Sequence, residues 1–347
     1  MKKQARPFRM GVIGTGWIGR RRAEVCAGHP LISELHLADV VPDVVQSAAA
    51  GTGATSWTTD YRELLDRVDA VIVSTAPETT HYPIARDALA AGKHTLLEKP
   101  MAFTLGEADD LLARSRASGA GFAVGYTQRF NPRFSYVKEC VAEGRVGKPV
   151  TALVSHHLTR QLGEKIAGRG ELGPSQMEAT HDLDLVLWWM APARPVRVYA
   201  QSVDGMMRAK HGLPDCIWIV VTNNDGTVFT VGANWNLPPE APGYSSMTVE
   251  FVGTDGAVFV DDSHRDVLLS TVKDGLIRPL STMPGEKVGH VYRGPMEGET
   301  LHFINAVARD EPLLVTGEQA RVVMEVTLAA DLSAELGRPV DLPLPAD

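Results

Sequence analysis

Cysteine is scarce in this sequence, and the three that occur form no recognisable pattern. Cys26, Cys140 and Cys216 are widely spaced and odd in number among 347 residues, which fits neither a disulfide framework nor a zinc site. We interpret each thiol as a small buried hydrophobe and expect no metal site. A chain of this kind is typical of a reducing compartment, so we expect a cytoplasmic protein.

Long apolar runs and basic blocks are also absent. The apolar run at residues 183–190 is far too short to cross a bilayer, and no apolar segment of signal-peptide length follows the basic start of the chain. Lys and Arg number 34 against 42 Asp and Glu, a net charge of −8. We therefore expect no nucleic-acid partner and no membrane partner. A hydrophobic content of 44% indicates an ordinary globular protein, and the length predicts two domains.

A glycine motif near the start of the chain is the strongest local signal. An apolar run at residues 8–13, typical of a buried strand, leads into Gly14-Thr15-Gly16-Trp17-Ile18-Gly19, which opens a helical segment. Gly14 suits a tight turn, Gly16 lets a pyrophosphate approach the backbone, and Gly19 lets helix and strand pack closely. Free N–H groups at the helix start favour phosphate. A glycine-rich turn without a ligand is the alternative, which this strand–turn–helix context disfavours.

An acidic residue follows at the place where a dinucleotide would need it. The apolar run at residues 35–38 closes on Asp39, whose carboxylate can accept both ribose hydroxyls of an adenosine. The same carboxylate repels a 2′-phosphate, and Val40 and Val41 offer no cation to offset that repulsion. We therefore predict NAD as the cofactor in preference to NADP. The three arginines at residues 20–22 are a reservation, because one could turn toward a phosphate.

Strands and helices alternate through the first third of the chain. The continuous apolar runs at residues 70–75 and 94–97 are typical of parallel strands covered on both faces. Thr104 and Glu107 form a capping box at the start of a helix. With a last strand near residues 121–126, we predict a doubly wound parallel sheet of about six strands.

The pattern changes after residue 127. A helix near residues 176–190 is followed by successive strands from Pro195 onward, with a hairpin signal at residues 223–226. Residues 161–174 show no apolar period and are expected to form a loop beside a site. We predict an α/β protein with a dinucleotide-binding Rossmann domain at residues 1–127. Residues 128–347 are predicted to form an α+β domain with a large, mostly antiparallel open sheet.

Several short motifs, in a fixed order along nearly the whole chain, resemble one family. They are Gly14–Gly19 with Asp39, Thr75-Ala76-Pro77 with Thr80-His81, Glu98-Lys99-Pro100, Gln128-Arg129-Phe130-Asn131-Pro132, His181-Asp182-Leu183-Asp184, and Val252-Gly253-Thr254-Asp255-Gly256. The chain resembles the glucose-fructose oxidoreductase, inositol dehydrogenase and MocA family. The resemblance implies NAD(P)-dependent oxidation or reduction of a hydroxyl-bearing carbon in sugars, inositols or related polyols. It also implies a homodimer or homotetramer formed through the open sheet.

The resemblance implies roles for particular residues. Lys99 and His181 are the implied catalytic residues, a cation that polarises the reacting oxygen and an imidazole that carries its proton. The expected cofactor contacts are Gly14, Thr15, Gly16, Trp17, Ile18, Gly19, Asp39, Thr75, Ala76, Pro77, Thr80, His81, Glu98 and Lys99. The expected substrate contacts are Lys99, Arg129, His156, Arg160, Met177, His181, Asp184, Trp235 and Tyr292. Of these, His156, Arg160, Trp235 and Tyr292 follow from their predicted positions and side-chain chemistry, and ordinary packing is an equal alternative for each.

One position departs from the family pattern. Many catalytic members carry an aspartate four residues before the histidine, where this chain has Met177. The neighbouring Glu178 would point about 100° away on an ideal helix and so could not replace it. Two alternatives to a dehydrogenase therefore stay open: a redox-neutral, NAD-dependent glycoside-cleaving enzyme, and a non-catalytic NAD and sugar sensor. The sequence leaves the substrate, the reaction direction, strict or dual cofactor use, and dimer or tetramer undecided.

Overall fold

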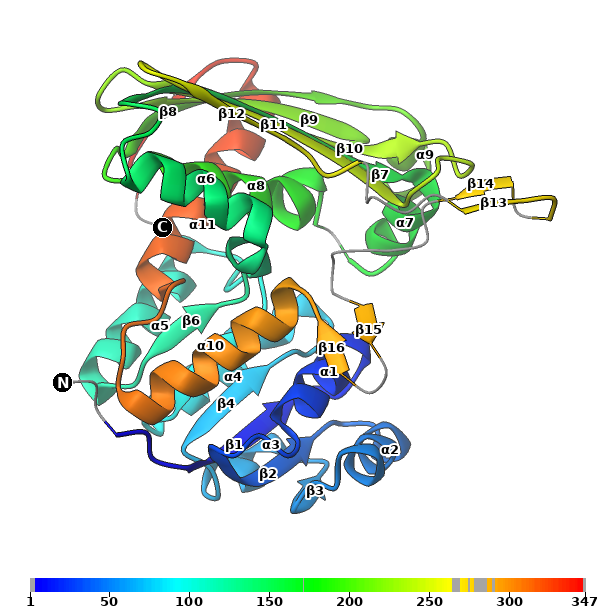
Figure 1. The fold of residues 1–347 in the computed structure, drawn as a ribbon, viewed down its shortest axis with the longest axis vertical. Helices are drawn as coiled ribbons and strands as arrows, with labels where there is room; N and C mark the ends of the chain where they lie inside the picture. The colour runs from blue at the N-terminus through cyan, green and yellow to red at the C-terminus, as the bar shows by residue number, and fades with distance from the viewer. Residues whose placement is uncertain are drawn as a thin grey trace. The chain divides into compact units, whose positions relative to one another are not determined.

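The computed structural model describes residues 4–170, 172–263, 269–273, 275–277, 286–288 and 291–345. It divides into two compact units (Figure 1), each built on its own large sheet. The first unit holds the described residues of 1–131 and 282–321, and the second holds those of 132–281 and 322–345. Among the described residues, no helix is both long enough and apolar enough to cross a membrane.

The first unit contains the six-stranded parallel sheet predicted from the sequence. Its strand order is β3-β2-β1-β4-β5-β6, a doubly wound arrangement. The strands are β1 (Phe8–Ile13), β2 (Ile32–Ala38), β3 (Ser56–Thr58), β4 (Ala70–Val73), β5 (His94–Leu97) and β6 (Phe122–Val124). All four residues of β4 are buried, as expected for a parallel strand with helices on both faces.

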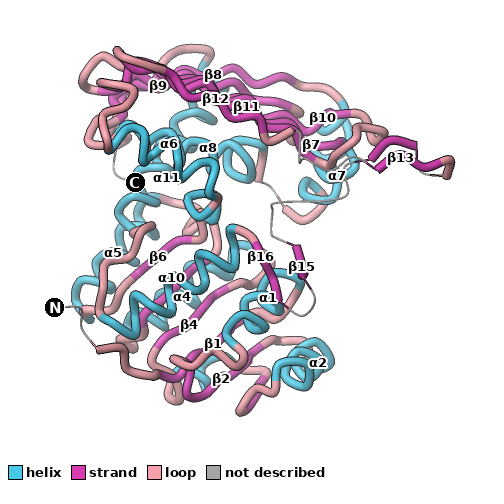
Figure 2. The backbone as a smooth tube through the Cα atoms, in the orientation of Figure 1, coloured by secondary structure: helices cyan, strands magenta, loops and turns pink. Residues whose placement is uncertain are grey.

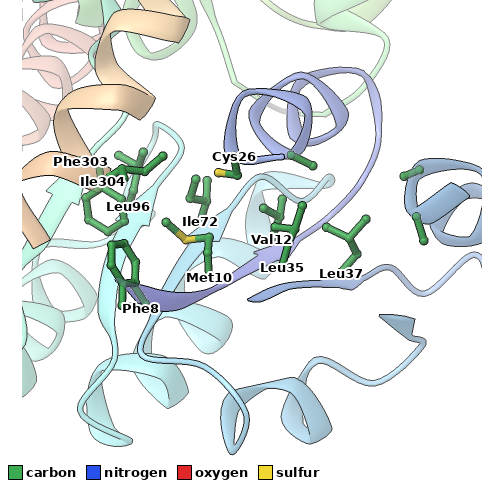
Figure 3. Packing of buried hydrophobic residues seen from close by; sticks show 14 of the residues in the cluster. Phe8, Met10, Val12, Cys26, Leu35, Leu37, Ile72, Leu96, Phe303 and Ile304 are labelled. Atoms are coloured by element: carbon green, nitrogen blue, oxygen red, sulfur yellow. The ribbon is translucent and has the colours of Figure 1, made fainter. Parts of the chain in front are cut away.

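The core of this unit includes a helix from far along the chain. On one face of the sheet, α1 (Trp17–Cys26), α2 (Pro42–Thr52) and α10 (Pro295–Arg309) contribute apolar side chains to a single buried cluster. Figure 3 shows Phe303 and Ile304 of α10 beside Leu96, next to the β1 residues Phe8 and Met10. Full burial of side chains of this size stabilises by roughly 1.5–3 kcal/mol each, so α10 belongs to this fold unit.

The remaining helices of the first unit follow their sequence signals. Asp60 accepts a hydrogen bond from the Arg62 N–H at the start of α3 (Tyr61–Leu65), and the capping box of Thr104 and Glu107 begins α5 (Leu105–Ser118). A short 3₁₀ turn, η1 (Glu78–Thr80), leads directly into α4 (His81–Ala90), and another, η2 (Thr127–Phe130), follows β6. Pro83 stands in the first turn of α4, where its missing N–H has no helical acceptor to lose.

The second unit is built on a seven-stranded mixed sheet of order β12-β11-β7-β10-β9-β8-β17. Only the pair β7 and β10 is parallel among the described pairs of this sheet, so it is mostly antiparallel as predicted. The strands are β7 (Pro149–Thr159), β8 (Pro195–Val203), β9 (Cys216–Asn223), β10 (Val228–Leu237), β11 (Ser245–Gly253), β12 (Ala257–Asp261) and β17 (Val340–Asp341). Two small ribbons pair β13 (Leu269–Thr271) with β14 (Gly275–Ile277) and β15 (Glu286–Val288) with β16 (Val291–Arg293).

Helices cover one face of this sheet, as the tube view shows (Figure 2). They are α6 (Pro132–Ala142), α8 (Thr180–Met190) and the second-unit part of α11 (Gly317–Leu336). The buried alternate residues of β9, Ile217, Ile219 and Val221, belong to this face, and Trp218 lies on the opposite, open face. This alternation is the period-2 pattern of a strand with one covered face.

Two parts of the second unit differ from the sequence prediction. The predicted loop at residues 161–174 is helical over its first half, because α7 spans Arg160–Ala167, and a short helix α9 (Met206–His211) was not predicted. Gly163 allows α7 to approach β10, since a Cβ there would lie 2.6 Å from the Trp235 Cβ. In the sequence alone, the same glycine favours a loop. The helix predicted at residues 176–190 begins as a π-helical turn at Ser175–Ala179 before α8.

The division into units also differs from the predicted boundary. The sequence prediction placed residues 128–347 in one continuous domain, whereas α10 packs in the first unit. The physical reason is burial: Phe303 and Ile304 of α10 are almost fully enclosed with the side chains of β1 and β5. The amphipathic pattern that predicted the helix carries no information about which sheet it covers.

Candidate cofactor and catalytic site

The glycine motif forms a tight turn between β1 and α1. Gly14 has φ +83°, a left-handed backbone angle that favours glycine. A Cβ at Gly19 would lie 1.7 Å from the Gly14 carbonyl oxygen, so no larger residue fits there. A Cβ at Gly16 would meet no atom within 4 Å among the described residues. The backbone at Gly16 is therefore open to a ligand at the start of α1, where N–H groups favour phosphate.

Asp39 lies beside this turn, at the end of β2. Its Oδ2 atom accepts a hydrogen bond of 2.7 Å from the Thr15 N–H, and its Oδ1 atom accepts one of 3.0 Å from the Val41 N–H. These bonds fix the carboxylate next to the glycine turn, where it can accept hydroxyl hydrogen bonds from a ribose. The open backbone at Gly16 and the fixed acid at Asp39 fit a dinucleotide with an unmodified adenosine ribose.

The three arginines that follow the motif have separate partners. Arg20 pairs with Glu24 at 3.4 Å, and Arg21 lies over the ring of Trp17 with its guanidinium carbon 3.9 Å from the ring centre. Arg22 is fully buried and bonds two carboxylates. The reservation about a phosphate partner therefore does not apply to Arg22.

The turn after β4 is held together by hydroxyl and imidazole groups. The Thr75 and Thr80 hydroxyl oxygens lie 2.7 Å apart, and the Thr80 hydroxyl donates to the Pro77 carbonyl at 2.7 Å. Buried His81 has its Nε2 atom 3.0 Å from the Thr75 carbonyl oxygen and its Nδ1 atom 2.8 Å from that of Pro100. His81 thus links the turn after β4 to the segment after β5. These two contacts fix the turn that carries Thr75 and Thr80.

Lys99 stands directly after β5, between two anchored neighbours. On one side, the Glu98 N–H donates to the Val73 carbonyl at 3.0 Å, and the Glu98 carboxylate accepts from buried Arg22 at 2.6 Å. On the other side, the Pro100 carbonyl is bonded by His81. The short segment that carries Lys99 is therefore fixed at both ends. It lies at the carboxyl end of a parallel strand, the edge where ligands of doubly wound sheets bind.

The predicted histidine lies on α8 in the second unit. His181 and Asp184 are both buried there, and Asp184 has no measurable exposure. Met177 is 8% exposed in the π-helical turn that precedes α8. A π-turn of this kind is rare and is frequent at functional sites. It also changes the side-chain directions that an ideal helix would give to residues 175–179.

A second histidine of this unit forms a buried ion pair. His156 on β7 has its Nδ1 atom 3.1 Å from the Asp182 Oδ2 atom on α8. Burial opposes the charged ring, but the carboxylates of Asp182 and, more weakly, Glu178 outweigh it and raise the pKa of His156 to about 9. His156 is therefore a cation at neutral pH. His157 points to the opposite face of the sheet, where its Nε2 atom lies 2.7 Å from the Ser155 hydroxyl, so the two histidines do not share a site.

The other expected substrate contacts have varied surroundings. Arg129 is buried in the first unit and donates to the Leu314 carbonyl at 3.0 Å and to Gln319 at 2.8 Å. Arg160 is the half-buried first residue of α7, and Trp235 is fully buried beside Gly163. Tyr292 belongs to β16, but its side chain lies outside the described residues. Across the described ranges, no group of three or more His, Cys, Asp or Glu side chains could hold a metal ion.

Sequence reasoning missed several residues around Lys99 and His181. Arg22 on α1 donates to Glu98 and to Glu299 of α10, and Asp182 pairs with His156. Asp182 belongs to the motif at residues 181–184, but the resemblance implies no role for it. Glu299 gave no signal at all, because it stands 277 residues from Arg22 in the chain.

Comparison with known proteins identifies the family. The model of an oxidoreductase family with an NAD-binding Rossmann fold matches residues 8–126, and that of the GFO/IDH/MocA C-terminal domain matches residues 134–259. Inositol 2-dehydrogenase 2 of Paenarthrobacter aurescens is 30% identical over an alignment 328 positions long that covers 90% of this chain and 91% of that protein. The chain belongs to the Gfo/Idh/MocA family.

Other relatives support the same placement of this Gfo/Idh/MocA protein. The scyllo-inositol 2-dehydrogenase (NAD(+)) of Bacillus subtilis is 25% identical over 96% of both chains. A crystal structure of scyllo-inositol dehydrogenase from Lactobacillus casei with bound NAD(H) and scyllo-inositol shares the fold, with a TM-score of 0.83 at 20% identity. That match covers 97% of this chain and 99% of the other. The predictions of family, fold class, oxidoreductase activity and NAD as cofactor are confirmed.

Proposed function

We propose that this Gfo/Idh/MocA protein is an NAD(H)-dependent dehydrogenase that acts on a secondary alcohol, or the matching ketone, of a sugar, inositol or related polyol. The observation that supports this most strongly is the anchoring of Lys99 after β5, between Glu98 and Pro100. Parallel strands end at one edge of a sheet, so Lys99 shares that edge with Gly14 after β1 and Thr75 after β4.

The cofactor contacts in this proposal are the residues named from the motifs. Gly14 to Gly19 would hold the pyrophosphate and Asp39 the adenosine ribose. The turn from Thr75 to Thr80 would lie along the nicotinamide half, together with Glu98 and Lys99. When bound, NAD accepts a hydride from the substrate carbon during oxidation and returns it during reduction.

The two catalytic roles belong to Lys99 and His181. The Lys99 ammonium donates a hydrogen bond to the substrate oxygen and stabilises the negative charge that develops as its proton leaves. The His181 imidazole takes that proton, so that loss of a proton from oxygen and of a hydride from carbon yields the carbonyl product. In the reverse direction His181 returns the proton. His156, Arg160, Asp184 and Trp235 remain candidate substrate contacts in the same unit as His181.

Met177 is the feature that keeps the rival functions open. A methionine in place of the aspartate found in many members leaves His181 without that carboxylate. A sensor that binds NAD and sugar without turnover would tolerate such a change. A redox-neutral glycoside-cleaving enzyme would retain NAD tightly and release product without net NADH. Intact Lys99 and His181 favour the dehydrogenase.

A substrate panel tests the proposal directly. The purified protein is mixed with NAD and each of a set of inositols, aldoses and their derivatives, and NADH is followed by its absorbance. The dehydrogenase proposal expects stoichiometric NADH with at least one polyol. Product without NADH would instead establish the redox-neutral rival, and sugar binding without any product would establish the sensor.

We further propose a homodimer or homotetramer formed through the open face of the second-unit sheet. Leu153, Tyr199, Trp218 and Phe259 are exposed on that face, on four different strands. An apolar surface of this breadth is unusual on a monomer. Light scattering over a wide concentration range should give an even multiple of the chain mass, and Trp218→Glu should reduce that mass. A monomeric wild-type mass at every concentration would contradict the proposed assembly.

We also propose a cytoplasmic location for this protein. Cys26, Cys140 and Cys216 are free thiols, and Cys26 and Cys140 are buried. Such thiols persist where the surroundings are reducing. Fractionation of the native cell, with an antibody to the protein, tests the location.

A further inference from the structure

A fully buried arginine joins three segments of the first unit close to Lys99. The Arg22 Nε atom donates to Glu98 Oε1 at 2.6 Å, and the Nη2 atom donates to Glu299 Oε2 at 2.6 Å. The Nη1 atom donates to the Thr300 hydroxyl at 2.9 Å. We call Arg22, Glu98 and Glu299 the carboxylate clamp. All three guanidinium nitrogens are thus engaged, each with a partner that accepts.

The carboxylate clamp sets one buried guanidinium against two carboxyl groups. Burial of Arg22 disfavours its charge, but Glu98 and Glu299 outweigh burial and raise its pKa further, so the guanidinium is always charged. One cation faces two carboxylates, and Lys99 is the next residue after Glu98. Buried ion clusters seldom add stability over well-packed apolar side chains of the same shape. The clamp therefore calls for a role other than holding α10 against the sheet.

The geometry around Glu98 shows what the clamp controls. The Glu98 carboxylate lies against Gly125, since a Cβ built at that glycine would lie 2.8 Å from its Oε2 atom. Its backbone N–H is bonded to β4, and Arg22 holds its Oε1 atom. Arg22 itself stands on α1, three residues after Gly19 of the dinucleotide turn. The clamp thus fixes the start of the Lys99 segment relative to the helix that would bind the cofactor.

We propose that Arg22 and Glu299 are positioning residues for Lys99, acting through Glu98. Glu299 keeps Arg22 oriented from the side of α10, and Arg22 holds the Glu98 carboxylate and, with it, the segment that presents the Lys99 ammonium. The inference rests on the proposed role of Lys99. Small displacements of a catalytic group are costly: a shift of about 1 Å can lower a rate by about 10²-fold.

Steady-state kinetics on the intact enzyme, with the best substrate of the panel, test this inference. Arg22→Met should lower kcat by about 10- to 100-fold while the NAD dissociation constant changes by less than about threefold. Arg22→Lys keeps the positive charge, so its kcat should be higher than that of Arg22→Met. It should stay below the wild-type kcat, because an ammonium cannot hold two carboxylates in a fork. Glu299→Gln is isosteric and should lower kcat by about fivefold or more, which keeps the test available if Arg22→Met does not fold.

The matched control is Ile304→Ala on the same helix. Ile304 is fully buried in the core and has no part in the clamp, so its truncation weakens the packing of α10 alone. The kcat values are compared between variants whose melting temperatures fall by similar amounts. A clamp that only fastens α10 would lower kcat no more in Glu299→Gln or Arg22→Met than in Ile304→Ala, and that result would overturn the inference.

A double-variant cycle separates this inference from the proposed function. If Lys99 is catalytic, Lys99→Met alone removes most turnover, and adding Arg22→Met should then lower the residual rate no further. Full additivity of the two changes would show that Arg22 acts independently of Lys99 and would overturn the inference. High activity of Lys99→Met itself would refute the proposed function, whatever Arg22→Met does.

Discussion

The His156 Nδ1 atom lies 3.1 Å from the Asp182 Oδ2 atom, inside the covered layer between β7 and α8 of the second unit. Asp182 immediately follows His181, so this ion pair fixes the helix turn that carries the proposed proton carrier. The second carboxylate oxygen of Asp182 is buried and has no hydrogen-bond partner among the described residues. The carboxylate therefore depends on His156 for compensation of its charge.

Because of this ion pair, the free energy of unfolding should fall at alkaline pH. The pKa of His156 rises from its ordinary 6.5 to about 9 in the folded protein, so the folded state holds the extra proton. The stabilisation that this proton adds to the folded state is complete below about pH 6.5. It is lost as pH rises through about 9, which lowers the free energy of unfolding by about 3 kcal/mol in total. Chemical unfolding from pH 6 to pH 10, followed by the fluorescence of buried Trp189 and Trp235, measures it.

The control for this pH effect is His156→Gln. Glutamine can still donate a hydrogen bond to Asp182 but cannot take up a proton, so the variant should be less stable at pH 6.5 and lose less stability by pH 9. Parallel loss of stability in both proteins across this range would mean that another group is responsible.

Asp39 should set the cofactor preference. Its fixed carboxylate accepts ribose hydroxyls and repels a 2′-phosphate, so NAD should bind about tenfold or more tightly than NADP, about 1.4 kcal/mol. Titration calorimetry with both cofactors measures the ratio. Asp39→Ser should weaken NAD binding and narrow the difference in affinity between NAD and NADP. The control Asp43→Ser, at an exposed acid in the first turn of α2, should change neither affinity. Equal or tighter binding of NADP by the wild-type protein would reject the assignment.

Two glycines of the motif should respond differently to alanine. Gly16→Ala places a methyl group in open space, so melting temperature should stay within a few degrees while NAD affinity falls, because the methyl occupies the side the pyrophosphate would approach. Gly19→Ala drives a methyl group into the Gly14 carbonyl and should destabilise the first unit. Calorimetric melting and NAD titration separate the two effects. Unchanged NAD affinity in Gly16→Ala would place the cofactor elsewhere.

Met177→Asp tests whether the missing carboxylate limits turnover. The change places the acid where many family members have it, four residues before His181. We expect a higher kcat or a shifted pH optimum with the panel substrate, set against Met177→Leu as the control of similar size. If the aspartate variant behaves as the leucine variant does, the carboxylate at this position has no part in proton transfer here.

Much of the first unit could be predicted from local sequence. Continuous apolar runs marked β1, β4 and β5, and the capping box marked the start of α5. These signals are local. A strand buried on both faces appears in the sequence as a continuous apolar run, and a capping box appears as two residues three positions apart. The hairpin between β9 and β10 was likewise found from its Asn-Asp-Gly turn residues.

The features that escaped prediction depend on contacts between distant segments. Nothing in the sequence near Glu299 indicates that it would meet Arg22, and nothing near His156 indicates that its ring would pair with Asp182. α7 escaped because Gly163, a helix-breaking residue by propensity, is needed there for contact with Trp235. Tertiary packing, absent from any local pattern, decided each case.

The central claim is that Lys99 and His181 perform the chemistry. Lys99→Met keeps the length and apolar stem of the side chain but deletes its charge, and His181→Asn keeps a polar group that is no base near neutral pH. The decisive measurement is kcat of both variants with the best panel substrate, beside their NAD dissociation constants. We predict a fall of about 10²- to 10⁴-fold in kcat for His181→Asn, and a large fall for Lys99→Met, with NAD affinity nearly unchanged. Turnover within a few-fold of wild type in both variants would contradict the mechanism.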